Sequence, residues 1–412
     1  MISNEKKLLV ILGLTMSAAW ISQSLMDLCI LILLGVLNLN MKQFLGLRLF
    51  ESRQSKLIFS SFIGYFIVSV LTAIFNAHAG YDSLGNLSKF VWVFQFLLFY
   101  WAAMQIDWSD LMSSQLQNIF KFFAWTSLIP IIYGFNIFLF EGVDLISLQQ
   151  TGYRIVGLLN SATYHGLVGG LLFCLLLPIC LMNLRRLNWN TILLNLVYLS
   201  LLFASATMTM TRGVWLSLLI SGVVLIYFLN FKKLILSAAA VTLVGIAIFQ
   251  TPIKTMIQAR SSSDSCRVKL LQTHWTIFKT YPFLGMGYRD NLRSIEEYWP
   301  ESEIANCRQL RDFGNHAHNQ YLNVLATTGL LGFLFFISFY LYFIVINLKL
   351  LAAYRNDSLH YPLCVSLLMM QIFFMVSNMT ETSFEYGKVR TVLLIVWAVV
   401  LAVYAKRREI KQ

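Results

Sequence analysis

Long apolar runs separated by short polar turns dominate the pattern of this chain from end to end. At roughly 20 residues for a helix that spans a bilayer, the sequence holds about twelve such runs. Backbone groups inside lipid form their hydrogen bonds within their own segment, so we expect each span to be an α-helix. The pattern therefore predicts an all-α polytopic membrane protein in which residues 1–412 form a single membrane domain. The predicted spans lie near residues 8–24, 25–39, 57–76, 90–104, 117–140, 163–183, 190–206, 213–229, 234–251, 319–345, 360–377 and 389–405.

Composition and charge agree with this pattern and predict its orientation. Hydrophobic residues make up 58% of the chain and charged residues 12%, which excludes an ordinary soluble protein. With the N-terminus in the cytoplasm, the clusters of lysine and arginine fall in turns on the cytoplasmic side, as the positive-inside rule requires. Both termini are therefore predicted to be cytoplasmic, and topology rather than nucleic-acid binding explains most of the net charge of +12. The residues concerned are Lys6, Lys7, Lys42, Arg48, Arg53, Lys56, Arg185, Arg186, Lys232, Lys233, Lys349, Arg355, Lys406, Arg407, Arg408 and Lys411.

Two predicted external loops, residues 141–162 and 252–318, are longer than simple turns. The second is too long for a bare connection, so we expect it to be partly folded and functional. Within it, apolar spacing predicts an amphipathic helix from Arg267 to Tyr281, ended by Pro282. This helix is expected to lie on the membrane or to pack over the spans, with Arg267 and His274 sharing a neighbouring face. Its apolar stripe consists of Val268, Leu271, Trp275 and Phe278, and a turn is predicted at Gly285-Met286-Gly287.

Arginines gather on the predicted external side, where the positive-inside rule leaves few of them. Arg212 opens the eighth span, and an arginine so close to hydrocarbon is either a functional cation or a side chain that anchors the helix end at the interface. Several further lysines and arginines lie in the large loop, where such residues commonly form a basic surface in contact with solvent. Their location on the external side instead favours binding of an anionic substrate through paired hydrogen bonds. The loop cations are Arg260, Arg267, Lys269, Arg289, Arg293, Arg308 and Arg311.

Two histidines, His316 and His318, stand where the large loop meets the next span. An imidazole at this position can accept a proton near neutral pH. The alternatives are packing at the start of a helix, or a metal site that lacks a carboxylate cluster to complete its shell. Glu381 and Glu385, near the last external turn, are expected at most to orient sugars. The chain has no P-loop, nucleophile-elbow or zinc-protease motif.

Cys266 and Cys307 both fall in the large loop. In an oxidising compartment they pair in a disulfide, or they are two unrelated thiols, and the spacing leaves both possibilities open. The other four cysteines lie in predicted spans and are expected to be ordinary packing residues.

Taken together, these residues resemble the O-antigen ligase and polymerase superfamily of bacterial inner membranes. The matching elements follow the family's order along the chain and occupy the expected places in the topology. They are Arg154, Gly157 and Asn160; Thr211-Arg212-Gly213; Arg267, Trp275, Pro282, Gly285 and Gly287; and His318-Asn319, Leu322, Gly329 and Gly332.

The resemblance implies a helical glycosyltransferase fold of the GT-C type and transfer of a glycan from an undecaprenyl-diphosphate carrier at the periplasmic face. It implies that Arg212 and Arg267 hold the diphosphate and that His318 either acts as general base on the acceptor hydroxyl or positions it. It further implies a reaction without metal or other cofactor and with inversion at the anomeric carbon. Arg154, Arg289, Asn319 and His316 are further candidates for contact with the substrate. For the ligase branch, which we favour, the acceptor is lipid A-core oligosaccharide.

Other functions stay open at this point. A polymerase of the same superfamily extends a growing glycan, and a protein O-oligosaccharyltransferase glycosylates protein hydroxyls; members of that branch often carry a periplasmic C-terminal domain, whereas this chain ends in a short basic tail. A transporter of anions or glycolipids is the alternative from another class. The absence of a two-half repeat and the scarcity of intramembrane carboxylates count against it.

Overall fold

The computed structural model describes residues 4–37, 53–75, 85–106, 108, 113–140, 154–159, 161–184, 188–228, 261–288, 298–299, 307 and 316–411. Within these ranges all regular structure is helical. The first half contains α1 (Asn4–Ile21), α2 (Gln23–Leu37), α4 (Arg53–Phe75), η1 (Gly85–Phe90), α5 (Val91–Met104), α6 (Ser113–Phe140), η2 (Gly157–Leu159) and α8 (Ala162–Met182). The second contains α9 (Trp189–Thr207), α10 (Arg212–Phe228), α12 (Ser261–Thr280), α15 (Gln320–Ala353), α16 (His360–Ser377), η4 (Ser383–Glu385) and α17 (Gly387–Lys411).

The helices coincide with the predicted spans wherever the structure describes them. The predicted span 360–377 matches α16 to the residue, and the span predicted at 234–251 lies outside the described residues. Among the described residues, seven helices are long and apolar enough to cross a membrane, while α2, α10 and the apolar parts of α1 and α6 are shorter. The chain is thus a multi-pass helical membrane protein. A count of twelve spans stays a prediction.

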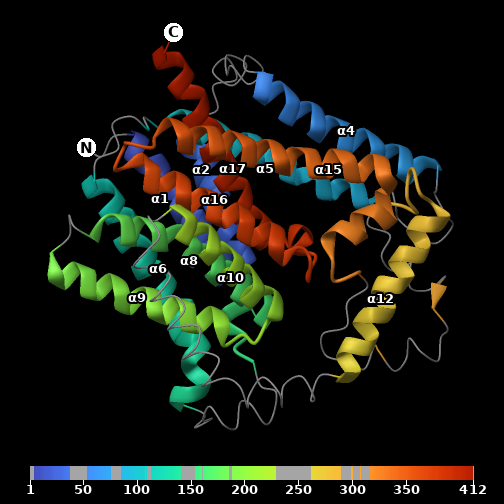
Figure 1. Cartoon of the computed structure of the whole chain (residues 1–412), viewed down its shortest axis with the longest axis horizontal. Helices are drawn as coiled ribbons and strands as arrows, with labels where there is room; N and C mark the ends of the chain where they lie inside the picture. The colour runs from blue at the N-terminus through green and yellow to red at the C-terminus, as the bar shows by residue number, and fades with distance from the viewer. Residues whose placement is uncertain are drawn as a thin grey trace.

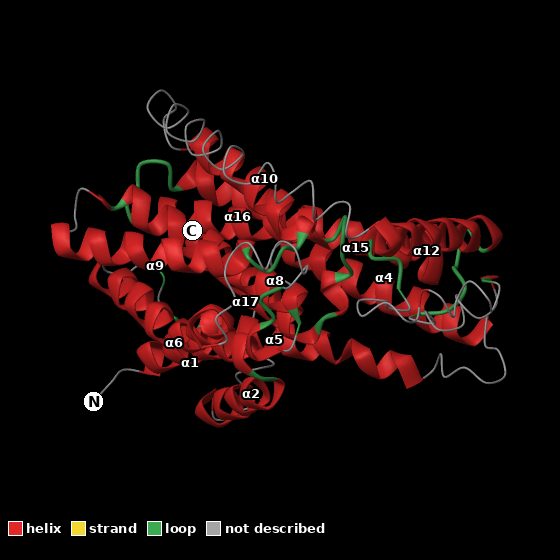
Figure 2. Cartoon of the chain, turned by 90° about the horizontal axis from the view of Figure 1, so that it is seen from below, coloured by secondary structure: helices red, strands yellow, loops and turns green. Residues whose placement is uncertain are grey.

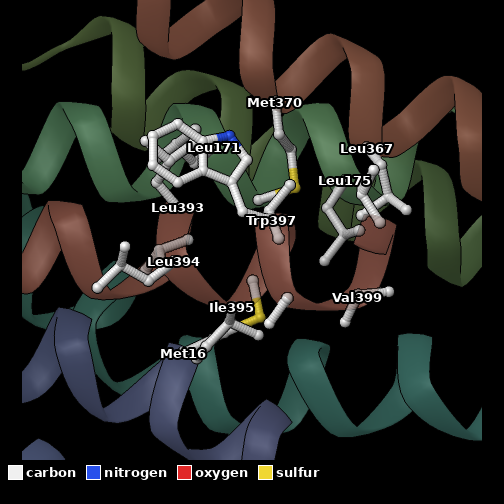
Figure 3. Close-up of a cluster of buried hydrophobic side chains, with 14 of the residues drawn as sticks. Met16, Leu171, Leu175, Leu367, Met370, Leu393, Leu394, Ile395, Trp397 and Val399 are labelled. Carbon is white, nitrogen blue, oxygen red and sulfur yellow. The ribbon is translucent and has the colours of Figure 1, made fainter. Parts of the chain in front are cut away.

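The core of the bundle forms where α17 passes between α5, α8 and α16. From Val392 to Val403, α17 is apolar on all sides and buried, as expected of a helix surrounded by protein. Trp397 contacts this core together with Leu171 of α8 and Met370 of α16, as the close-up shows (Figure 3). Figure 1 places both chain ends on the left of the bundle, away from α12 on the right.

The predicted amphipathic helix is confirmed as α12, which packs against α15 (Figures 1 and 2). The face that packs is not the predicted apolar stripe. Leu270, His274 and Ile277 point inward and are buried, whereas Val268 and Trp275 are 51% and 46% exposed. The expected stripe is therefore not the face that packs against the bundle, because spacing alone does not show which side of a helix meets the bundle.

A kink in α15 determines where α12 packs. Gly329 has φ +65° and interrupts the helix, and the turn after α12 fills the interruption. Met286 N donates to Ala326 O at 2.9 Å, and Leu330 N donates to Pro282 O at 2.8 Å. A Cβ atom on Gly329 would overlap the backbone of Phe283, so only glycine allows this approach. Gly285, Gly287 and Gly329 thus all take part in the contact between this turn and α15.

Candidate active site

Three segments meet at the end of the bundle where α12 lies: residues 316–319, the turn 378–386 between α16 and α17, and α12 itself. Gln320 N, in the first turn of α15, donates to Asn378 O at 2.8 Å. Asn319 caps α15, since its Oδ1 accepts from Leu322 N at 3.0 Å, and its Nδ2 donates to Met379 O at 3.1 Å. Asn319 therefore joins the start of α15 to the turn that carries Glu381.

His318 stands at the centre of this junction in an uncommon backbone conformation. Its φ is +47°, in the left-handed region that costs energy for a side chain with a Cβ atom, and the residue is buried. Its Nδ1 lies 3.1 Å from Oε2 of Glu381. The strained backbone directs the imidazole toward this carboxylate, and the surrounding hydrogen bonds hold it there.

Glu381 joins His318 to Arg267. The carboxylate is buried, and its Oε1 lies 3.5 Å from a terminal guanidinium nitrogen of Arg267. Burial raises the pKa of this carboxyl, but the hydrogen bond with His318 and the positive charge of Arg267 outweigh burial and hold the pKa below its ordinary value. Glu381 is therefore a buried anion that orients both side chains, which is more than the sugar-orienting role expected from the sequence.

This arrangement sets the tautomer of His318. A carboxylate only accepts hydrogen bonds, so in neutral His318 the proton lies on Nδ1 and the lone pair on Nε2. Among the described residues, no group forms a hydrogen bond with Nε2. His318 is thus oriented by a carboxylate and presents an unoccupied basic nitrogen, as a general base requires.

His316 supports His318 from the side. Its ring centroid lies 4.5 Å from that of His318, its Nδ1 accepts from His318 N at 3.4 Å, and its Nε2 lies 3.3 Å from the Tyr386 hydroxyl. Burial, reinforced by His318, lowers the pKa of His316 to about 4, so this ring is neutral near pH 7. Within the described part of the chain, no three histidine, cysteine or acidic side chains are grouped as metal ligands would be.

Arg212 approaches the same turn from α10. It is the first residue of that helix, and its side chain is exposed. A Cβ atom on Gly213 would overlap the Thr380 hydroxyl, so glycine lets the helix start lie directly against the residue before Glu381. Arg267 on α12 and Arg212 on α10 are therefore both placed beside the Glu381 turn.

Arg154 fixes the segment that leads into Arg212. Its Nε donates to Thr209 O and its Nη2 donates to the Thr211 hydroxyl, both at 2.9 Å. These contacts hold the turn in which Met210 has φ +53°. The structure thus gives Arg154 a positioning contact, and its binding of substrate stays a prediction. Asn160 and Arg289 lie outside the described residues.

Cys266 and Cys307 form a disulfide, which resolves the choice left open by the sequence. The bond lies next to Arg267 and attaches residue 307 to α12. The indole of Trp299 donates to the Thr273 hydroxyl on the same helix. Both contacts stabilise the part of α12 that presents Arg267.

Sequence reasoning undervalued the last turn before α17. Besides Glu381, Glu385 accepts from Asn323 Nδ2 at 2.7 Å, and Asn323 Oδ1 lies 3.5 Å from Ala317 N. This chain of contacts supports the backbone beside His318. Two acidic residues between two apolar runs are the signal that could have found this turn, because carboxylates near a membrane are costly unless they have partners.

The comparisons with known proteins bear on the same residues. The family model described as O-antigen ligase matches residues 196–337, a segment that contains Arg212, Arg267 and His318. A comparison with curated proteins gives no match. Residues 196–337 thus carry an O-antigen ligase family domain, and the resemblance of this chain to the O-antigen ligase and polymerase superfamily is confirmed.

Proposed function

We propose that this protein is an O-antigen ligase of the bacterial inner membrane. It transfers O-antigen polysaccharide from undecaprenyl diphosphate to lipid A-core oligosaccharide at the periplasmic face, with both termini in the cytoplasm. The observation that carries this proposal is the connection His318–Glu381–Arg267, which places a possible base and an arginine on one buried carboxylate. The arginine can bind an anionic leaving group, and the base can take the proton from an acceptor hydroxyl.

Arg267 and Arg212 are proposed to bind the diphosphate. Arg267 is 32% exposed and uses one terminal nitrogen for Glu381, and a guanidinium has further N–H donors in a planar fork that matches phosphate oxygens. Arg212 is exposed at the start of α10, where the helix dipole also favours an anion. Together they stabilise the negative charge that grows on the leaving diphosphate, so the reaction needs no metal.

His318 is proposed to remove the proton from the acceptor hydroxyl. As the hydroxyl oxygen bonds to the anomeric carbon, the bond from that carbon to the diphosphate breaks and the proton passes to Nε2 of His318. The buried carboxylate of Glu381 stabilises the resulting imidazolium through Nδ1. Attack opposite the leaving group inverts the anomeric configuration.

The second candidate is a polymerase, which uses the same donor chemistry with a growing glycan as acceptor. The family match over residues 196–337 suits both enzymes. Deletion of the gene, followed by analysis of surface polysaccharide, separates them. Free lipid A-core with accumulated polymeric carrier-linked glycan is expected for a ligase, whereas single repeat units on the core would assign a polymerase. Unchanged lipopolysaccharide would overturn both.

A further inference from the structure

A second histidine, His274, is buried on the inner face of α12, seven residues after Arg267. Two helical turns separate the two residues, about 10 Å along the axis, so both lie on nearly the same side of the helix. Nδ1 of His274 lies 2.8 Å from Leu270 O. A carbonyl oxygen only accepts, so Nδ1 carries the proton and Nε2 carries a lone pair.

Nε2 of His274 is buried and has no hydrogen-bond partner among the residues that the structure describes. The helix that carries this ring packs against α15, which begins two residues after His318, and both Glu385 and His318 act electrostatically on the ring. Burial lowers the pKa of His274 to about 4, so the ring stays neutral and Nε2 remains an acceptor near pH 7. A buried acceptor without a donor is costly, and proteins rarely retain one without a use.

We propose that Nε2 of His274 accepts a hydrogen bond from a sugar hydroxyl of the bound glycan, next to the hydroxyl that reacts at His318. A neutral lone pair binds a hydroxyl donor but repels phosphate oxygens, so this atom suits the glycan rather than the diphosphate. Since Nε2 is covered in this structure, the glycan reaches it when surrounding side chains move apart on substrate entry. The proposal rests on the glycan transfer proposed above. The hydroxyl belongs to the donor or to the acceptor glycan.

Two substitutions of His274 test the contributions of its two ring nitrogens separately. In His274→Asn the amide nitrogen replaces Nδ1 as the donor to Leu270 O, but nothing replaces Nε2. In His274→Gln the longer side chain places an amide oxygen near the position of Nε2, and the donor to Leu270 is lost. The purified variants and the wild type are compared for transfer from an undecaprenyl-diphosphate glycan to lipid A-core, with KM measured for each substrate and the melting temperature recorded.

The expected result is a KM about tenfold higher for one substrate in His274→Asn, the effect of one lost hydrogen bond, with no fall in melting temperature. His274→Gln should keep most of the wild-type KM, and the substrate whose KM changes identifies the source of the hydroxyl. Equal behaviour of the two variants, or a loss that follows a lower melting temperature, overturns the role of His274 while wild-type transfer preserves the proposed function. A wild-type protein that transfers nothing to either acceptor overturns both.

Discussion

Two buried histidines, His165 in the span bundle and His318 at its end, use the same side chain in opposite ways. In α8, Nδ1 of His165 accepts from the Trp20 indole at 2.9 Å, and Nε2 lies 2.8 Å from the Ser205 hydroxyl. Both nitrogens are therefore satisfied by the protein. His318 has one nitrogen on the Glu381 carboxylate, no described partner for the other, and a strained backbone.

The difference separates a histidine that only packs from one that is proposed to react. The hydrogen bonds of His165 offset the cost of burying its polar atoms, and they join α1, α8 and α9. At His318 the protein satisfies only the atom that sets orientation and tautomer, and Nε2 has no hydrogen-bond partner among the described residues. We expect substitutions at His165 to change stability and substitutions around His318 to change chemistry.

The largest effect is expected for His318→Ala. Loss of a general base should lower kcat by about 10²- to 10⁴-fold while the protein still accumulates in the membrane. The measurement is transfer by purified protein together with its melting temperature. His316→Ala is the matched control and should be milder. Equal and complete losses at both positions would instead favour a metal site or a structural role.

The second largest fall in kcat is expected for Glu381→Gln. The amide cannot stabilise an imidazolium or pair with Arg267, so kcat should fall roughly ten- to a hundredfold, the value of a hydrogen bond to a charged group. Glu385→Gln is the control, because an amide oxygen still accepts from Asn323. If Glu381→Gln kept the wild-type kcat, the carboxylate would have no part in orienting His318.

Lysine replacements test the arginines. Arg212→Lys and Arg267→Lys should each lower kcat/KM for the lipid-linked donor by about tenfold or more, since a point charge cannot reproduce the bidentate fork. Arg355→Lys, in the exposed turn between α15 and α16, serves as the control for a general loss of arginine. Full activity of both test variants would rule out their binding of the diphosphate.

His165→Phe should affect stability alone. It leaves the Trp20 indole and the Ser205 hydroxyl without their partner, at a cost of about 1–3 kcal/mol for each buried group left unsatisfied. The melting temperature should fall, whereas kcat of the folded protein should stay near the wild-type value. A fall in kcat without a fall in melting temperature would show that the two histidine sites do not divide their roles in this way.

The smallest effect is expected in the dependence of folding stability on pH. Burial lowers the pKa of His274 and His316 from 6.5 to about 4, so between these values the unfolded chain binds more protons than the folded chain. Stability should therefore fall as pH decreases from about 6.5 toward 4, and protonation of Glu381, whose pKa is also lowered, adds to the loss at the acid end. Melting temperatures from pH 7 to pH 5 measure the effect, and the slope should be shallower in His274→Asn. A flat profile would contradict the neutral burial of both histidines.

Much of the helical pattern was readable in the amino-acid sequence, since apolar length and turn residues are local properties. The bounds of α16 and the end of α12 before Pro282 follow from such signals. The candidates His318, Arg212 and Arg267 were also found locally, because each is a polar group placed where membrane topology makes polarity costly. The pairing of Cys266 with Cys307 needed the fold to decide between two open possibilities.

The partners of these residues were decided only by the tertiary structure. Glu381 is 63 residues from His318 in the chain, yet their side chains lie within hydrogen-bond distance. The inward face of α12 depends on how the turn from Pro282 to Gly287 enters the kink at Gly329. A sequence determines helices through hydrogen bonds between near neighbours, but contacts between distant segments depend on the packing of the whole bundle. Local patterns therefore supplied the candidate groups, and packing decided which of them were buried together and which nitrogen of His318 faces the Glu381 carboxylate.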